Sequence, residues 1–296
     1  MINELIKTNS TIVENELKKY ISKSDNYGLS EVMSYSLLSG GKRIRPFIAI
    51  EAYKLFSGGK EDIERVLPFA CALEMIHTYS LIHDDMPCMD NDDYRRGKLT
   101  NHKVYGEAKA LLAGDSLLTY AFEVASENKY VNEKSIVLAI NSLAKCAGYQ
   151  GMAGGQMIDL DSGNNIKSFE ELKHMHALKT GELIKCALLL GYYAYYDKIN
   201  PLAEKDIEKI AYNIGIAFQI RDDILDRISD IETLGKEIGS DERNGKITSL
   251  TYFSVQEAQE KVNFLTKEAI EILKKYSDGK ENTLSIFAKY LVERKK

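Results

Sequence analysis

The sequence predicts an all-α fold, and three observations support this prediction. Only four of the 296 residues are proline, whereas the helix-forming residues Ala, Leu, Glu and Lys are abundant. Apolar residues recur at helical spacing along almost the whole chain. Hydrophobic residues make up 44% of the chain, which is enough for a sizeable core and argues against a disordered protein.

Short turns divide this helical pattern into successive segments. They lie at residues 39–45, 57–60, 91–100, 161–167, 197–201 and 240–245. No low-complexity linker separates the segments, so we expect residues 1–296 to form a single domain of roughly ten or more helices. In such bundles, functional sites form where side chains from facing helices meet in the core.

Charge and composition limit the classes of partner and the cellular location that we expect for the protein. A net charge of −5 gives no reason to expect binding to nucleic acid. No apolar run approaches the roughly 18 residues of a membrane span, and residues 1–23 lack the continuous apolar stretch of a signal peptide. The four cysteines have no CxxC spacing and are expected to be free thiols of a cytoplasmic protein: Cys71, Cys88, Cys146 and Cys186.

A first acidic cluster lies in SLIHDDMPCMDNDDYRRGK, residues 80–98, directly after an apolar segment that predicts a buried helix. Pro87 removes a backbone donor and pushes the residue before it away from helical angles, so the helix should end or kink near Asp85. The chain can then fold Asp90 back toward Asp84, and two carboxylates would converge at the helix end.

A second acidic cluster lies in FQIRDDILD, at the end of another mostly apolar helix. Asp222 and Asp226 share one face of that helix, and Gln219 lies one turn earlier on the same face. A single cluster of this kind is more typical of a solvated helix face. Two clusters on two apolar helices favour carboxylates that lie at the core.

Converging carboxylates repel each other unless they share a proton or a cation. Magnesium fits this arrangement, because it is usually held by one or two carboxylates together with substrate phosphates. An EF-hand calcium loop is the alternative, but the spacing lacks the glycine and the terminal glutamate of such a loop. A zinc site would need a Cys/His set that is missing here. The two clusters therefore predict magnesium ions bound together with a polyphosphate.

Basic residues with phosphate-binding potential accompany the acidic clusters. The segment GGKRIRP places Lys42, Arg43 and Arg45 beside two glycines that let backbone approach a ligand. Arginine binds phosphate oxygens in a bidentate manner and lysine binds them as a point charge. Further basic residues in or near short motifs are Arg95, Arg96, Lys179, Lys236 and Lys246.

Taken together, these motifs resemble those of the trans-isoprenyl diphosphate synthases. GGKRIRP, HTYSLIHDDMPCMDNDDYRRG, GGQMIDL, KTGEL, FQIRDDILD and LGKEIGSD occur in the family's order and span roughly residues 37–250. The sequence is most similar to the bacterial type of farnesyl diphosphate synthase, whose first aspartate motif has two extra residues, here Pro87 and Cys88. The resemblance implies the isoprenoid synthase fold, an orthogonal helical bundle around a deep central cavity, and a homodimer.

The resemblance also implies an activity, a magnesium-dependent prenyl transfer. Isopentenyl diphosphate would be joined head-to-tail to dimethylallyl or geranyl diphosphate to give farnesyl diphosphate, with three Mg²⁺ per site and Mn²⁺ as an alternative ion. Geranylgeranyl diphosphate synthases share most of these motifs and are the first alternative. A terpene cyclase is less compatible, because it needs no second-substrate site and usually has another second metal motif. A non-catalytic partner subunit would be expected to lack one aspartate motif, and both are present.

Motif matching assigns roles to individual residues. The metal ligands would be Asp84, Asp90 and Asp222, with direct or water-mediated ligation by Asp85, Asp223 and Asp226. The isopentenyl diphosphate site would comprise Lys42, Arg45, His77 and Arg96. The allylic diphosphate would contact Arg95, Lys179, Lys236 and Lys246. The catalytic set near the allylic cation would be Lys179, Thr180 and Gln219.

Residues outside these sets receive structural interpretations. We expect His174 and His176 to be solvated or locally bonded. Gly154 and Gly155 should allow close helix packing, because no strand precedes them as in a phosphate-binding loop.

Two residues before the first aspartate motif are candidates for control of product length. Tyr79 and Ser80 precede Asp84 by five and four residues, about 7.5 and 6 Å along a helix axis. The allylic tail should run back along this helix, so the bulky Tyr79 can close the pocket. In the family, an aromatic residue here together with the two-residue insertion goes with farnesyl-length products. Simple core packing of Tyr79 is the alternative.

Overall fold

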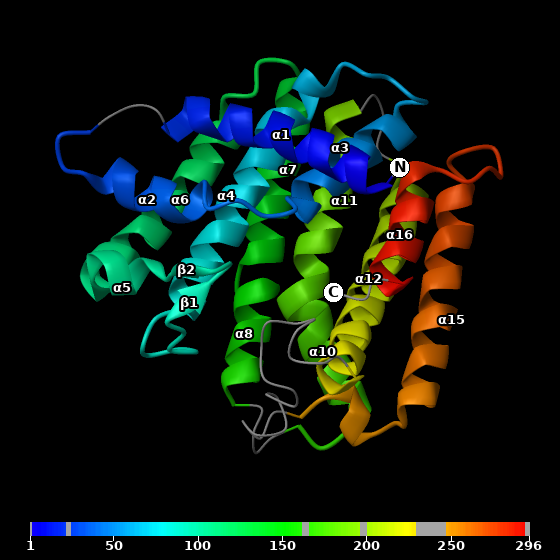
Figure 1. Ribbon diagram of the computed structural model, residues 1–296. Helices are drawn as coiled ribbons and strands as arrows, with labels where there is room; N and C mark the ends of the chain where they lie inside the picture. Colours follow the sequence, from blue (N-terminus) through cyan, green and yellow to red (C-terminus); the bar gives the residue numbers. More distant parts are fainter. Residues whose placement is uncertain (1, 22–24, 162–165, 196–199, 229–246, 294–296) are drawn as a thin grey trace. The chain divides into compact units, whose positions relative to one another are not determined.

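The computed structural model describes residues 2–21, 25–161, 166–195, 200–228 and 247–293. Their regular secondary structure is helical apart from one two-stranded hairpin (Figure 1). The predicted all-α class is therefore confirmed. The chain divides into two compact units, which comprise residues 3–143 with 189–197, and residues 144–188 with 198–296. A single domain with a deep central cavity stays a prediction.

The first unit contains the N-terminal helices and the hairpin. Its elements are α1 (Ile2–Ile21), α2 (Leu29–Leu37), α3 (Ile44–Phe56), η1 (Ile63–Arg65), α4 (Leu67–Asp84), β1 (Tyr94–Arg95), β2 (Lys98–Leu99), α5 (Asn101–Tyr105) and α6 (Glu107–Ser126). The helix α7 (Glu133–Ala147) begins in this unit, and α11 (Glu182–Tyr195) ends in it. At the centre lies α4, which packs along α6 (Figure 1). Residues 67–76 of α4 are all buried, as expected for a helix that is apolar on every side.

The second unit is built around a long helix. Its other elements are α8 (Met152–Leu160), α10 (Phe169–His176), the π-helical turn η2 (Ala177–Gly181), α12 (Pro201–Ile228), η3 (Ser249–Thr251), α15 (Val255–Lys274) and α16 (Thr283–Glu293). The long helix α12 packs on α15, and α15 packs on α16 (Figure 1). Ile216, Ile220 and Ile224 of α12 form a buried cluster with Ala258 and Val262 of α15.

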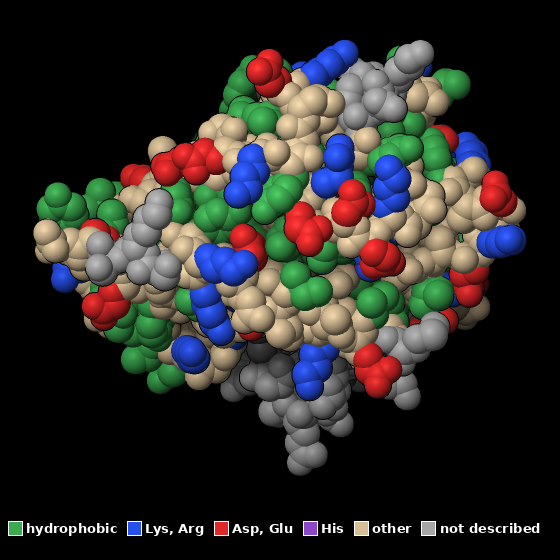
Figure 2. Space-filling view, turned by 90° about the horizontal axis from the view of Figure 1, so that it is seen from above, with side chains coloured by type: hydrophobic (Ala, Val, Ile, Leu, Met, Phe, Trp, Pro, Cys, Tyr) green, Lys and Arg blue, Asp and Glu red, His purple; other side chains and the backbone are tan. Residues whose placement is uncertain are grey.

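Surface charge, helix apolarity and the state of the cysteines can be compared with the expectations from the sequence. On the face drawn in Figure 2, Lys and Arg side chains are interspersed with Asp and Glu, and no large patch of one charge stands out. Among the helices of the described ranges, none combines the length and apolarity that a bilayer crossing requires. All four cysteines are free, as predicted.

Candidate functional site

The first aspartate segment reverses direction as predicted from Pro87. Helix α4 ends at Asp84. The backbone N–H of Met86 donates to the carbonyl of His83 at 3.1 Å, and the N–H of Asp90 donates to the carbonyl of Asp84 at 2.9 Å. The backbone of Asp90 therefore lies beside that of Asp84, with Asp84 half-buried and Asp90 exposed. The predicted return of Asp90 to the helix end is confirmed.

The neighbouring Asp85 lies in a different environment. Its side chain is 5% exposed, and its Oδ1 atom accepts hydrogen bonds from Nε and Nη2 of Arg95, each at 2.6 Å. Burial raises the pKa of Asp85 above its usual value, although the Arg95 guanidinium acts in the opposite direction. Since this carboxylate already binds an arginine, its arrangement fits a residue that orients Arg95.

The hairpin places the second arginine of this segment against the turn at residues 39–43. Arg96 and Gly97 both have positive φ and join β1 to β2, which is the geometry of a two-residue type I′ turn. The Arg96 guanidinium donates to the carbonyl of Gly40. A Cβ atom on Gly41 would lie 2.8 Å from Cζ of Arg96, so the glycine leaves room for the guanidinium. The two glycines of GGKRIRP thus accommodate Arg96.

Arg45 and His77 are joined directly. Nη1 of Arg45 donates to Nε2 of His77 at 3.1 Å, since a guanidinium carries no acceptor. Burial first, and then the charge of Arg45, hold the pKa of His77 well below its usual value, so the imidazole is neutral and accepts this bond. The Nε atom of Arg45 is buried and has no hydrogen-bond partner among the described residues. A buried donor of this kind fits an anionic ligand.

Three of the four residues matched to isopentenyl diphosphate lie near one another, since the charge of Arg96 acts on both Arg45 and His77. Arg45 binds His77, and Arg96 lies against Gly41, whose chain neighbour is the exposed Lys42. Arg43 of the same segment is different, because its side chain is fully buried and pairs with Glu74 at 2.7 Å. The Arg43 guanidinium is therefore not available to bind a phosphate, and Arg43 has a structural role.

Tyr79 is packed by His83, which in turn lies on Gly114, and the sequence analysis singled out neither residue. Its ring meets the His83 ring edge-on, with centroids 5.7 Å apart. The His83 ring lies on the bare backbone of Gly114 in α6, where a Cβ atom would come within 2.1 Å of Nε2. The glycine in the apolar segment LLAGDSLL was the available signal of this close approach. The hydroxyl of Ser80 donates to the carbonyl of His77 at 2.9 Å, within its own helix.

In the second unit, Lys179 and Thr180 lie on the π-helical turn η2. Such turns are rare and occur often at functional sites. Nζ of Lys179 binds Oδ2 of Asp159 in α8 at 2.5 Å. A Cβ atom on Gly155 would lie 2.3 Å from the backbone nitrogen of Lys179, so Gly155 allows the close packing that the sequence predicted. Asp159 is a further residue that the sequence analysis did not single out, although it lies in GGQMIDL.

The second aspartate cluster lies on α12 beside Thr180. Oγ1 of Thr180 donates to Oε1 of Gln219 at 2.5 Å. Asp222 and Asp226 are partly exposed, whereas Asp223 is 9% exposed. Oδ2 of Asp223 accepts from the backbone N–H of Ser249 at 2.7 Å, which ties α12 to the start of η3. Asp222 and Asp226 are therefore better placed than Asp223 to meet a ligand. Lys236 and Lys246 lie outside the described residues.

The carboxylates of the two aspartate segments are compatible with magnesium that also binds phosphate. No group of three or more His, Cys, Asp or Glu side chains in the described ranges could hold a metal by itself. Magnesium commonly takes only one or two protein carboxylates and completes its octahedron with phosphate oxygens and water. Asp84 with Asp90, and Asp222 with Asp226, are the carboxylates that would hold such ions.

His176 differs from the expectation of a solvated or locally bonded residue. It is 7% exposed, and its Nδ1 atom has no partner among the described residues. Burial lowers its pKa to about 4, with Lys179 adding to the decrease and Asp159 opposing it. That expectation was wrong for His176, because α10 turns this residue into the core, whereas His174 is exposed.

The pKa of His176 predicts a loss of stability in acid. An unfolded histidine titrates near 6.5, so between about pH 6.5 and 4 the unfolded chain binds more protons and stability falls as the pH falls. His176 should contribute about 2 kcal/mol of this loss between pH 7 and pH 5. Urea unfolding of the His176→Gln variant should show a pH dependence weaker by that amount, and His174→Gln should match wild type. Equal pH dependence in all three proteins would contradict the burial effect.

The polyprenyl synthetase family profile matches residues 26–289. The chain is 45% identical to a geranylgeranyl diphosphate synthase of Cyanophora paradoxa, over 96% of this chain and 93% of that protein. It is 41% identical to a farnesyl diphosphate synthase of Geobacillus stearothermophilus, over 89% and 88% of the two chains. A crystal structure of an FPP/GFPP synthase from Zymomonas mobilis matches with a TM-score of 0.85 and 33% identity, covering 99% of this chain and 100% of that one.

Proposed function

Because this chain belongs to the polyprenyl synthetase family and is a prenyltransferase, we propose that it makes farnesyl diphosphate. It would condense isopentenyl diphosphate head-to-tail, first with dimethylallyl diphosphate and then with geranyl diphosphate. The catalyst would be a cytoplasmic homodimer that requires magnesium. Exposed apolar side chains on α6 and α7, among them Leu112 and Val137, support the dimer, since a second copy would cover them.

The observation that carries this proposal is the set of basic residues around GGKRIRP. Arg45, held by His77, presents a buried Nε donor without a partner among the described residues, and Arg96 lies beside Gly41. These residues would bind the diphosphate of isopentenyl diphosphate. A cyclase has no need of a second diphosphate site, so this arrangement favours condensation.

The residues of the two aspartate segments would hold the ions. Asp84, Asp90, Asp222 and Asp226 would bind Mg²⁺, about three ions per site in the family pattern, and Mn²⁺ could replace it. The ions would supply positive charge next to the allylic diphosphate, which stabilises the leaving group as its carbon–oxygen bond breaks.

The other polar residues would orient the substrate and balance charge. Arg95, oriented by Asp85, and Lys179, oriented by Asp159, would bind the oxygens of the allylic diphosphate. The oxygens of Thr180 and Gln219 would face the allylic cation and stabilise it by their dipoles. Released diphosphate would accept the proton that the condensation frees.

The length of the product is the finer part of this proposal. Relatives of this chain carry the names of both farnesyl and geranylgeranyl diphosphate synthases. We infer the shorter product from Tyr79, whose ring is braced by His83 on Gly114 and would close the pocket beneath a farnesyl chain. Geranylgeranyl diphosphate is the second candidate because of the 45% identical relative.

Tyr79→Ala should therefore lengthen the product. Removal of the ring would leave space for at least one more five-carbon unit, so most product should move from 15 to 20 carbons or more. Chromatography of the dephosphorylated alcohols measures this shift. Ser80→Ala, at the second candidate position, removes only a hydroxyl that is bonded within the helix and should leave the product distribution nearly unchanged. An unchanged product distribution in Tyr79→Ala would refute the role of Tyr79.

The whole proposal is tested with purified protein and Mg²⁺. Isopentenyl diphosphate should be consumed with dimethylallyl or geranyl diphosphate, and farnesyl diphosphate should accumulate. Conversion of an allylic diphosphate to a cyclic hydrocarbon without isopentenyl diphosphate would instead identify a cyclase. Absence of both reactions would reject the activity.

A further inference from the structure

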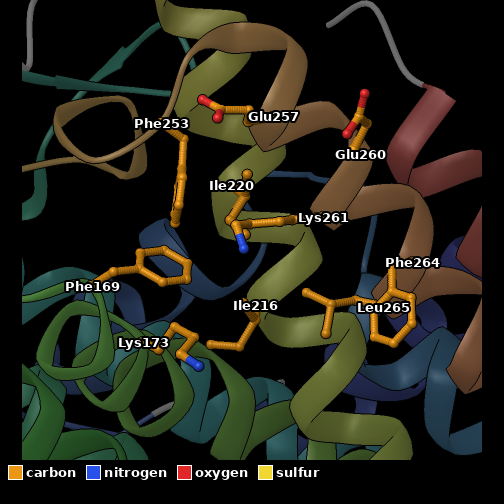
Figure 3. Close-up of a pocket in the computed structure, with 10 residues that line it drawn as sticks. All are labelled: Phe169, Lys173, Ile216, Ile220, Phe253, Glu257, Glu260, Lys261, Phe264 and Leu265. Atoms are coloured by element: carbon orange, nitrogen blue, oxygen red, sulfur yellow. The ribbon is translucent and has the colours of Figure 1, made fainter.

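An open pocket of about 500 Å³ lies in the second unit between α10, α12 and α15 (Figure 3). Its walls are mainly apolar, with Phe169 and Phe253 on one side and Ile216 and Ile220 of α12 behind them. Phe264 of α15 adds to the lining, although 62% of its surface is exposed. This volume lies within the range of about 300–1,000 Å³ that is usual for small-molecule sites.

The pocket is separate from the residues matched to catalysis. Successive residues of a helix are turned by about 100°, so Ile216 and Ile220 lie on a different face of α12 from Asp222 and Asp226. Neither Lys179 nor Gln219 lines the pocket. The function proposed above therefore leaves this pocket unused.

Two ammonium groups lie over these aromatic walls, and that of Lys173 is 5.4 Å from the ring centre of Phe169. Nζ of Lys261 lies 4.4 Å from the ring centre of Phe253 and 5.7 Å from that of Phe169 (Figure 3). Within the described ranges, no carboxylate lies within ion-pair distance of Lys261, although its charge also acts on Glu257 one turn away. Contacts with aromatic rings attract a cation but leave its hydrogen-bond donors available.

The other charged residues of the pocket are already engaged or point away. The Glu257 carboxylate accepts from the backbone and hydroxyl of Ser254, which closes the cap of α15. In Figure 3, the carboxylates of Glu257 and Glu260 point away from the Lys261 ammonium. Lys173 is paired with Glu170 at 2.8 Å. The charge that faces the aromatic walls without a carboxylate at ion-pair distance is therefore the ammonium of Lys261.

We propose that this pocket binds a single-chain amphipathic anion, with its hydrocarbon tail on the aromatic and aliphatic walls and its acidic head on Lys261. Burial of the tail provides the affinity, at roughly 25 cal/mol per Å² of apolar surface removed from water. The ammonium, held between two rings, selects an anionic head over a neutral one. A phosphate ester or a carboxylate satisfies this chemistry, and both fatty acids and isoprenyl diphosphates belong to the class.

The binding is tested by methyl NMR with octyl phosphate as the probe. The δ1 methyl resonances of Ile216 and Ile220, assigned by Ile→Val substitution, should shift saturably with octyl phosphate. Octanol and inorganic phosphate, which lack the head or the tail, should shift them at least tenfold more weakly. Displacement by dodecanoate or by farnesyl diphosphate then identifies the source of the natural ligand.

Lysine variants of α15 complete the test. Lys261→Met keeps the stem but removes the charge and should weaken binding at least tenfold, whereas Lys261→Arg should retain it. The exposed Lys267 of the same helix does not line the pocket, so Lys267→Met should bind like wild type. The methyl spectrum of each variant verifies its fold. Absence of saturable shifts in wild type, or equal affinity in Lys261→Met, would overturn the proposal.

Discussion

Asp84→Asn should lower kcat/KM for the condensation by about a thousandfold, which corresponds to about 4 kcal/mol of transition-state stabilisation. Asparagine has nearly the same shape but lacks the negative charge. The Mg²⁺ ions that bind the diphosphate would therefore lose an anionic protein ligand. The backbone bond between Asp90 and Asp84 does not involve the changed group, and the fold should persist. Steady-state assays over a range of Mg²⁺ concentrations measure the effect.

Two further variants make this result specific. Asp222→Asn on α12 should show a comparable loss, because it removes a carboxylate of the second cluster. Asp93→Asn serves as the control, since Asp93 lies in the same segment as Asp84 but pairs with Lys103 at 2.7 Å. It should keep kcat/KM within about threefold of wild type. Near-normal turnover in Asp84→Asn would exclude the metal role of that residue.

Arg43→Met should lower the free energy of unfolding by about 3–5 kcal/mol. The Arg43 side chain is fully buried, with Nη1 bonded to Glu74 and Nη2 to the carbonyl of Leu37, each at 2.7 Å. Its removal leaves a carboxylate in the core without a cation, and the cost of that buried charge dominates the loss. Urea unfolding at neutral pH measures the change.

A double variant separates the buried charge from the packing. Arg43→Met combined with Glu74→Leu removes both charges and should recover most of the lost stability. Lys42→Met changes the exposed neighbour and should alter stability by less than about 0.5 kcal/mol. If Arg43→Met were as mild as Lys42→Met, the pair would not be a buried charge pair in solution.

The sequence was sufficient where local stereochemistry determines the structure. Pro87 limits the backbone of its neighbours by covalent geometry, so the end of α4 and the return of Asp90 could be predicted. The close approach at Gly155 was equally predictable, because a glycine pair in a helix without a preceding strand indicates packing.

Other features depend on residues that are distant in sequence. Asp84 and Asp85 are adjacent and chemically identical, yet Asp85 is buried and accepts hydrogen bonds from Arg95 of the hairpin, whereas Asp84 is half-buried. The role of Gly114 depends on the His83 ring of another helix, and the pKa of His176 depends on how deeply α10 is buried. The spacing of residues along one helix does not predict these contacts and this burial, because they are determined by how the helices pack together.

The turn η2 has a consequence for insertions and deletions in this part of the chain. Residues 169–195 run without interruption through α10, η2 and α11, so the wider turn offsets everything after it by one position relative to a regular helix. Loss of one residue within η2 would restore the ordinary repeat and leave α11 facing as it does, whereas loss of one residue between η2 and Gly191 would rotate the end of α11 by about 100°. Gly191 now lies where a methyl group would be 2.4 Å from the carbonyl oxygen of Ala49, and that rotation would bring a bulkier residue there. The number of residues between η2 and Gly191 is therefore constrained, even where individual side chains could vary.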